Sequence, residues 1–129
     1  MIYSKIDSFK ILVSPATAGI DTRWMDPFME ACELLDCKID YLATHHYLRV
    51  GEEQQTMDRL KAFSERYGGR KIWFTEFAVR NTHNEDEVIG VIENLLPMYD
   101  NSFKTFVTIL INIHSSFKNQ ILYCCFIVG

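Results

Sequence analysis

The sequence lacks the features by which several large protein classes are recognised. Its 13 lysine and arginine residues are outnumbered by 17 aspartate and glutamate residues, which gives a net charge of −4. That balance provides no basic surface for nucleic acid and no polybasic patch for anionic lipid. No apolar run reaches the ~18 residues of a membrane-spanning helix. Phosphate-cradling glycine loops, the G-x-S-x-G motif and cysteine–histidine nucleophile signatures are also missing. The charge balance favours an uncharged or neutral-polar substrate.

The cysteines have neither a zinc-binding spacing nor an evident disulfide partner. They are Cys32, Cys37, Cys124 and Cys125, and the last two, being adjacent, cannot form an ordinary bridge with each other. We therefore expect free, buried thiols rather than a disulfide or a metal site. The N-terminus, MIYSKIDSFK, has no apolar segment of the signal-peptide type, so the sequence leaves the compartment unknown.

Residues 1–100 alternate three times between a strand pattern and a helix pattern. Strands are expected at residues 10–17, 39–47 and 71–79. Because short loops join these repeated units, the pattern predicts an α/β fold with a parallel sheet. The chain has 129 residues, fewer than the ~200–250 of a complete (β/α)₈ barrel.

Three helices are expected between and after these strands. The first should begin with Asp26 as N-cap and Pro27 in the first helical position. The second covers residues 52–67 and ends at Gly68-Gly69. Asn84 should cap the third. Apolar residues recur at helical spacing in the second and third helices: Met57, Leu60, Phe63 and Tyr67, and then Val88, Val91, Ile92, Leu95 and Leu96.

Residues 101–129 form a tail of different composition. Its only charges are Lys104 and Lys118, so it carries +2 and, against a net charge of −4, residues 1–100 carry −6. Apolar runs at residues 106–113 and 121–128 flank the polar segment HSSFKNQ. The tail is either a final barrel strand with a helix or sequence that does not belong to the domain, and its composition does not decide between them.

Polar residues that suit catalysis occur late in the second and third strands. By strict alternation, His45 and Tyr47 share one face of their strand, and Glu76 shares a face with Ile72 and Phe74. A carboxylate between large apolar residues costs free energy unless it is paired or used in chemistry. A nearby imidazole or tyrosine hydroxyl would hold it ionised and oriented. We therefore expect His45, Tyr47 and Glu76 to converge at the carboxyl end of the sheet.

A metal site involving Glu76 is the alternative chemistry. His45 and His46 are adjacent in a strand and must point to opposite faces, which argues against joint coordination. His83 follows the Glu76 strand and lies within reach of it, so a His/Glu site stays open. We expect neither a metal nor a cofactor.

The segments LVSPATAG, W-x-D-x-F-x-x-x-C, CKIDYLATHHY and KIWFTEFAV, in this order, resemble the alkali-sensitive-linkage-protein-like enzymes of glycoside hydrolase family 128, which act on β-1,3-glucan. The resemblance covers residues ~10–100 and implies a partial (β/α)₈ barrel containing the fifth, sixth and seventh strands. By this likeness Glu76 matches the nucleophile of a retaining mechanism, while His45 and Tyr47 match an H-W-Y motif. His46 stands where the family usually has tryptophan.

The family's acid/base glutamate lies in an N-E-P-type motif on the fourth strand, and no such motif occurs here. Nothing before Lys10 supplies it, and Glu85 lies on the wrong element. The aromatic eighth strand is also not recognisable in the tail. We therefore expect the catalytic half-domain at residues 1–100 to be inactive alone. The alternatives are a half-barrel that binds β-glucan without hydrolysing it, and one that self-associates through exposed sheet edges.

Overall fold

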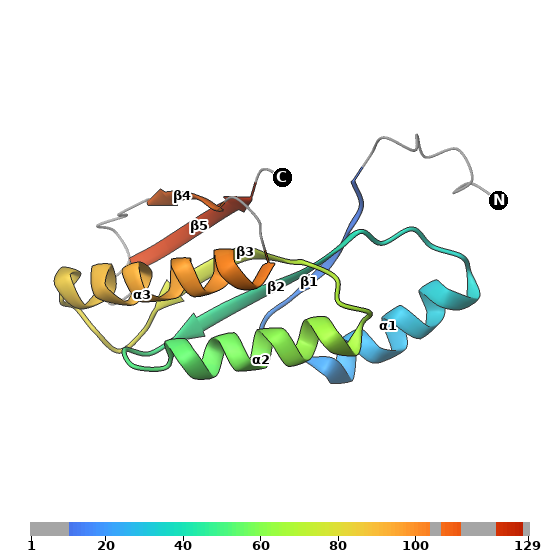
Figure 1. Cartoon of the computed structure of the whole chain (residues 1–129), viewed down its shortest axis with the longest axis horizontal. Helices are drawn as coiled ribbons and strands as arrows, with labels where there is room; N and C mark the ends of the chain where they lie inside the picture. Colours follow the sequence, from blue (N-terminus) through green and yellow to red (C-terminus); the bar gives the residue numbers. More distant parts are fainter. Residues whose placement is uncertain (1–10, 104–106, 112–120, 128–129) are drawn as a thin grey trace.

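A computed structural model describes residues 11–103, 107–111 and 121–127 of the chain. Three strand–helix units follow one another, and two further strands come after them (Figure 1). In chain order the elements are β1 (Val13–Thr17), α1 (Thr22–Leu34), β2 (Tyr41–Leu48), α2 (Glu53–Arg66), β3 (Ile72–Val79), α3 (Glu85–Phe103), β4 (Val107–Ile111) and β5 (Ile121–Ile127). The three units predicted from the sequence are confirmed, with boundaries shifted by a few residues.

The first three strands are parallel and lie in the order of the chain. β1 pairs with β2, and β2 pairs with β3, in a five-stranded sheet of order β1-β2-β3-β5-β4. Parallel neighbours require a crossover, and in each case the intervening helix provides it. The carboxyl ends of β2 and β3 therefore meet at one edge of the sheet, which places the residues predicted for the site near one another.

The tail does not form the strand and helix that were one of its two open alternatives. β5 pairs antiparallel with β3 and lies next to it in the sheet. β4 pairs antiparallel with β5 and lies at the sheet edge. The two apolar runs thus form two strands rather than a strand and a helix. Antiparallel strands need only a short connection, whereas a further parallel strand would need another crossover.

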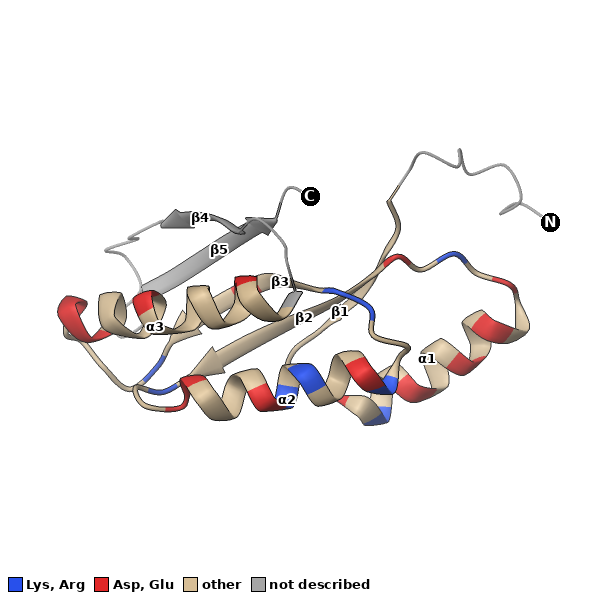
Figure 2. Ribbon diagram, in the orientation of Figure 1, with Lys and Arg blue, Asp and Glu red and all other residues tan. Residues whose placement is uncertain are grey.

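All three helices lie on one side of the sheet (Figure 1). Their buried side chains form one hydrophobic core with residues of β2 and β3. The α2 positions predicted from their spacing, Met57, Leu60, Phe63 and Tyr67, all belong to this core. The charged residues lie mainly on the helices and loops, and the parallel strands carry few (Figure 2). The helices therefore separate one face of the sheet from solvent. None of the described helices is long and apolar enough to span a bilayer.

The start of α1 differs from the prediction. Asp21, and not Asp26, is the N-cap, and its carboxylate accepts a hydrogen bond of 3.0 Å from the backbone N–H of Arg23. Pro27 consequently lies inside the helix rather than in its first position. The prediction was wrong because the Asp-Pro pair imitates a helix start while an earlier aspartate already caps the first turn.

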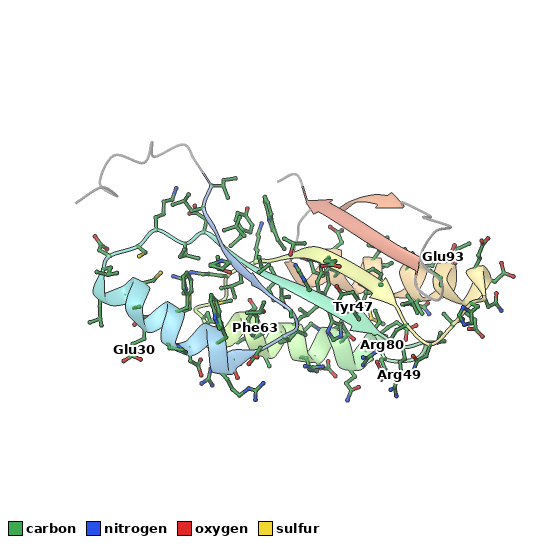
Figure 3. All side chains as sticks on the ribbon, turned by 180° about the vertical axis from the view of Figure 1, so that it is seen from behind. Glu30, Tyr47, Arg49, Phe63, Arg80 and Glu93 are labelled. Carbon is green, nitrogen blue, oxygen red and sulfur yellow. The ribbon has the colours of Figure 1, made fainter. Side chains whose placement is uncertain are left out.

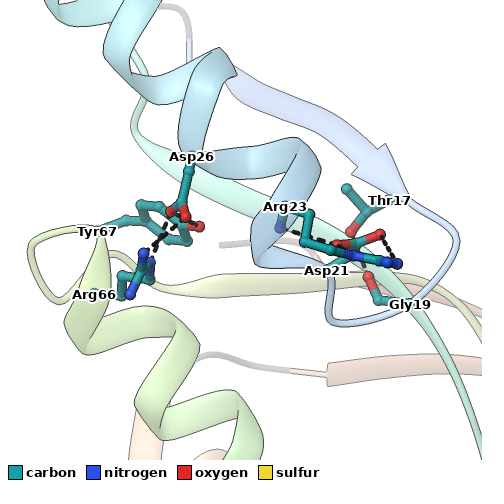
Figure 4. Close-up of polar contacts among 7 residues, drawn as sticks. All are labelled: Thr17, Gly19, Asp21, Arg23, Asp26, Arg66 and Tyr67. Atoms are coloured by element: carbon teal, nitrogen blue, oxygen red, sulfur yellow. Dashed lines mark hydrogen bonds and ion pairs between the residues drawn. The ribbon is translucent and has the colours of Figure 1, made fainter.

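The side chain of Asp26 instead joins α1 to the end of α2 (Figure 4). Its two carboxylate oxygens accept hydrogen bonds of 2.7 Å from the guanidinium of Arg66, in a bidentate arrangement. The hydroxyl of Tyr67 donates a third, of 2.8 Å. These contacts lower the pKa of Asp26, whereas burial and the bond to Asp26 raise the pKa of Tyr67 to about 12.

The ends of α2 and α3 follow the sequence predictions. Gly68 and Gly69 have backbone φ angles of 78° and 72°, in the left-handed region that favours glycine, and they end α2. Asn84 accepts a hydrogen bond of 3.0 Å from the backbone N–H of Asp86 at the start of α3. At the other end of α3 the hydroxyl of Tyr99 donates to the carbonyl of Ile72, which fixes the helix against the first residue of β3.

Candidate functional site

Side chains of β2 point alternately to the two faces of the sheet. One face packs against the helices, and the opposite face is called the open face below. Leu42, Thr44, His46 and Leu48 are buried on the helix side, and Tyr41, His45 and Tyr47 are half-buried on the opposite face. Successive side chains of a strand point to opposite faces, so this is the expected pattern. The predicted grouping of His45 with Tyr47 is confirmed.

The alternation of β3 is interrupted, and the predicted grouping of Glu76 with Phe74 is wrong. Thr44 pairs with Phe74, but the next residue of β2, His45, pairs with Glu76. The shift leaves Thr75 as an extra residue in β3, as in a β-bulge. Beyond it, Phe77 and Val79 face the helices as Ile72 and Phe74 do. Glu76 therefore lies on the same face as His45 because of the bulge and not because of simple alternation.

The bulge brings Glu76 directly beside His45. The Nδ1 atom of His45 lies 2.9 Å from Oε2 of Glu76, and both side chains are a little under one-third exposed. An Nδ1–H bond to the carboxylate fixes the orientation of both groups. The pair lies late in both strands, at the end of a parallel sheet where catalytic groups of barrel enzymes are found.

Tyr47 lies on the same face as His45, two residues farther along β2, where it is half-buried and aligned with Ala78 of β3 (Figure 3). It thus extends the polar row of the site toward the carboxyl end of the sheet. Of the two residues predicted to reach Glu76, His45 lies 2.9 Å from it.

His46 is a core residue and not part of this row. It is 9% exposed, and its Nε2 lies 3.2 Å from the hydroxyl of Thr56 on α2. Burial, with smaller contributions from the positive charges of Arg59 and Arg80, lowers the pKa of His46 to about 4. The imidazole is therefore neutral near pH 7 and packs beneath α2, on the face opposite His45.

The metal alternative gains no support from the arrangement. His83 is exposed in the loop between β3 and α3. Among the residues that the structure describes, no group of three or more histidine, cysteine, aspartate or glutamate side chains is placed to hold a metal ion. The side chains of Cys124 and Cys125 lie outside the described residues; Cys32 and Cys37 are free, the first buried and the second exposed.

Sequence reasoning missed an aromatic pair on the open face. The rings of Tyr41 and Trp73 are 5.5 Å apart between centroids, at the beginning of β2 and β3. Strict alternation assigns Trp73 to the face opposite Glu76. The bulge at Thr75 places both residues on the same face, so alternation alone could not predict the aromatic pair beside Glu76. Among the residues that the structure describes, the indole N–H of Trp73 and the hydroxyl of Thr75 are buried without a hydrogen-bond partner. The open face thus holds aromatic surface near the His45–Glu76 pair.

Comparisons with known proteins agree on one family. Residues 3–121 match the family model described as glycosyl hydrolase catalytic core. The chain is 38% identical, over 95 residues, to alkali-sensitive linkage protein 1 of Schizosaccharomyces pombe. That match covers 69% of this chain but only 17% of the length of the yeast protein.

Solved structures of an endo-β-1,3-glucanase from Amycolatopsis mediterranei, of glycoside hydrolase family 128, subgroup I, are also similar. One, a variant in complex with laminaritriose and laminaribiose, has a TM-score of 0.54 and 24% identity, over 70% of this chain and 42% of its own. Another, in complex with laminaritriose, has a TM-score of 0.52 and 25% identity, over 67% of this chain and 41% of its own. The chain therefore spans less than half the length of these enzymes.

Proposed function

Because this chain belongs to the glycosyl hydrolase catalytic core family and is similar to the enzymes of glycoside hydrolase family 128, we propose that it forms part of a retaining hydrolase of β-1,3-glucan. In this proposal β1, β2 and β3 are the fifth, sixth and seventh strands of a (β/α)₈ barrel. Residues 1–100 belong to the catalytic domain, and residues 101–129 form an atypical apolar tail, of which the family match includes the part up to residue 121.

The contact between His45 and Glu76 carries this proposal. Glu76 is the only acidic residue in the three parallel strands. It lies on the open face, late in its strand, with its Oε2 2.9 Å from Nδ1 of His45. A carboxylate that is held by an imidazole and partly open to solvent can approach a bound sugar. Those are the requirements for a nucleophile that attacks an anomeric carbon.

In the proposed reaction Glu76 forms a covalent bond to the anomeric carbon of the glucan as the leaving oxygen departs. His45 orients the carboxylate for that attack, and Tyr47 contacts the sugar or the ester that forms. Water then cleaves the ester and restores Glu76. The aromatic rings of Tyr41 and Trp73 fill the open face below the reacting groups.

A retaining mechanism needs a second carboxyl group ~5–5.5 Å from the first, to protonate the leaving oxygen. Since Glu76 is the only acid in β1, β2 and β3, we propose that the second group comes from sequence outside these 129 residues. The chain alone is then expected to be inactive. General acid catalysis contributes typically ~10²–10⁴-fold.

The test joins this chain to a family half-domain that supplies the fourth strand. We expect the joined protein to release reducing sugar from laminarin-type oligosaccharides, and the chain alone to release none. Glu76→Gln should abolish turnover in the joined protein, and Glu76→Gly should regain it with azide, giving a glycosyl azide of inverted configuration. The control, Glu93→Gln, changes an exposed acid on α3 and should retain activity. Full activity in Glu76→Gln would show that another residue is the nucleophile.

Glucan binding without hydrolysis is the second candidate function. The aromatic and polar side chains of the open face favour it, since sugars bind to aromatic rings and hydrogen-bonding groups. Titration calorimetry of the 129-residue chain with laminari-oligosaccharides tests it directly. Binding that is lost in Tyr47→Ala would support it, and the absence of heat at millimolar oligosaccharide would reject it. Sedimentation at several concentrations distinguishes both functions from self-association through the edge strands β1 and β4.

A further inference from the structure

The end of α1 brings two cysteines together. Asp36, just beyond the C-cap Leu35, has a φ of 53°, in the left-handed region. The backbone N–H of Asp36 donates to the carbonyl of Glu33 at 3.3 Å, and that of Cys37 donates to the carbonyl of Cys32 at 2.8 Å. These two bonds define a Schellman motif, which folds the chain back over the last turn of the helix.

In this motif the side chain that follows the left-handed residue packs against the side chain at the start of the last turn. Those positions are commonly hydrophobic, and here they are Cys37 and Cys32. The turn places Cys37 beside Cys32 at the end of the helix. Cys32 is buried, at 7% exposure, whereas Cys37 is exposed. The helix end therefore presents one accessible thiol beside one protected thiol.

We propose that Cys32 and Cys37 form a reversible intrachain disulfide by exchange with a small-molecule disulfide such as glutathione disulfide. This modification site does not depend on the proposed glycosidase function. The turn that brings Cys37 back over the last turn of α1 is already formed while both thiols are free.

The exchange proceeds in two balanced steps. The thiolate of Cys37 attacks one sulfur of glutathione disulfide, forming a mixed disulfide and releasing one glutathione, which takes up the proton that Cys37 lost. The thiol of Cys32 then loses its proton, and its sulfur attacks the sulfur of Cys37. The second glutathione leaves with that proton. Two protein thiols are oxidised, and one glutathione disulfide is reduced to two glutathione molecules.

The order of the two cysteines follows from their surroundings. Burial, and then the hydrogen bond to Cys37, raise the pKa of the Cys32 thiol to about 11. Because the thiolate is the attacking species, buried Cys32 is a poor first nucleophile. Exposed Cys37 meets the oxidant, and Cys32 resolves the mixed disulfide from its place directly beside it.

Tryptic mass spectrometry of the full chain tests the proposal. Cleavage after Arg23 and Lys38 places both cysteines in one fragment, residues 24–38, and leaves Cys124 and Cys125 in another. After incubation with glutathione disulfide and alkylation with iodoacetamide, we expect fragment 24–38 to carry no label and to have lost two hydrogens. After treatment with dithiothreitol it should carry two labels.

Single variants separate the two steps. In Cys32→Ser the glutathione on Cys37 should persist, because no resolving thiol is present. In Cys37→Ser the reaction with glutathione disulfide should be at least ~10-fold slower. Circular dichroism checks that both variants fold, and the result on the unmodified chain stands without them. Two labels on oxidised fragment 24–38, a persistent glutathione adduct on it, or a bridge from it to residues 119–129 would each overturn the proposal.

Discussion

The two faces of the sheet differ most clearly at two adjacent residues of the same type. His46 faces the helices, contacts Thr56, and has a pKa lowered to about 4 by burial. His45 faces the open side, remains partly exposed, and contacts Glu76. Two histidines one position apart in a strand thus face opposite sides of the sheet, and only one of them is a candidate site residue. Residue type alone does not identify a functional histidine; the face of the sheet on which it lies does.

The largest loss of stability should come from removing Thr75, the bulge residue that decides which side chains of β3 face the helices. Deleting Thr75 would restore regular alternation, so either Phe77 and Val79 or Ile72 and Phe74 would leave the core. We expect the free energy of unfolding to fall by more than ~4 kcal/mol, as judged by urea denaturation. Thr75→Val keeps the chain length and should cost less than ~1 kcal/mol, because the buried hydroxyl has no partner among the described residues. Equal stability of the deletion and the parent would rule out a bulge.

The next prediction compares the loss of stability when one aromatic residue is removed from each side of the sheet (Figure 3). Phe63 is 2% exposed in the core, whereas Tyr47 is half-buried on the open face. Phe63→Ala should lower the free energy of unfolding by ~3–5 kcal/mol. Tyr47→Ala should cost less than that, since part of its surface already contacts solvent. Similar losses in the two variants, measured by urea denaturation at pH 7, would mean that the open face is packed as tightly as the core.

A smaller effect should appear on acidification. The pKa of His46, about 4 in the folded chain, lies below the ordinary value of 6.5, so the unfolded chain binds this proton more tightly. The free energy of unfolding should therefore fall as the pH drops from about 6.5 toward 4, by about 2 kcal/mol. In His46→Gln this part of the pH dependence should disappear, while in the control His45→Gln it should remain. Parallel urea titrations at pH 7 and 4.5 provide the comparison; an unchanged pH slope in His46→Gln would contradict it.

The smallest effect on stability should come from the site pair itself. His45 and Glu76 are both about 28–29% exposed, and partly exposed ion pairs contribute only ~0.2–1 kcal/mol. His45→Gln should therefore change the free energy of unfolding at pH 7 by less than ~1 kcal/mol. In the joined protein it should still lower kcat on laminarin-type substrates. A loss of stability above ~2 kcal/mol would indicate that the pair holds the sheet together instead.

Periodicity was sufficient for the regular parts of the molecule. The three strand–helix units, the buried stripe of α2 and the alternation of β2 follow from apolar spacing, because burial against one face imposes it. The resemblance to family 128 is supported by the comparisons. The pairing of His45 with Glu76 was also expected, although the alternation used to place Glu76 was wrong. The catalytic roles of Glu76, His45 and Tyr47 stay predictions.

The features that were missed depend on contacts between distant residues. A bulge at Thr75 is decided by which residues of β3 fill the core against three helices, and no local pattern in KIWFTEFAV reports this. Asp26 was taken for a helix cap because its partners, Arg66 and Tyr67, are about 40 residues away. The direction of β5 depends on its pairing with β3, which composition does not specify.

The distance in sequence between Asp26 and its partners has a consequence during synthesis on the ribosome. Arg66 and Tyr67 are made 40 and 41 residues after Asp26. At ~5–20 residues per second, about 2–8 s pass before the guanidinium that anchors α1 exists. Until then the nascent helix relies on the cap at Asp21 and the turn at Asp36, both of which are complete within its own unit. The two local caps are thus the contacts of α1 that translation completes before the contact with Arg66 exists.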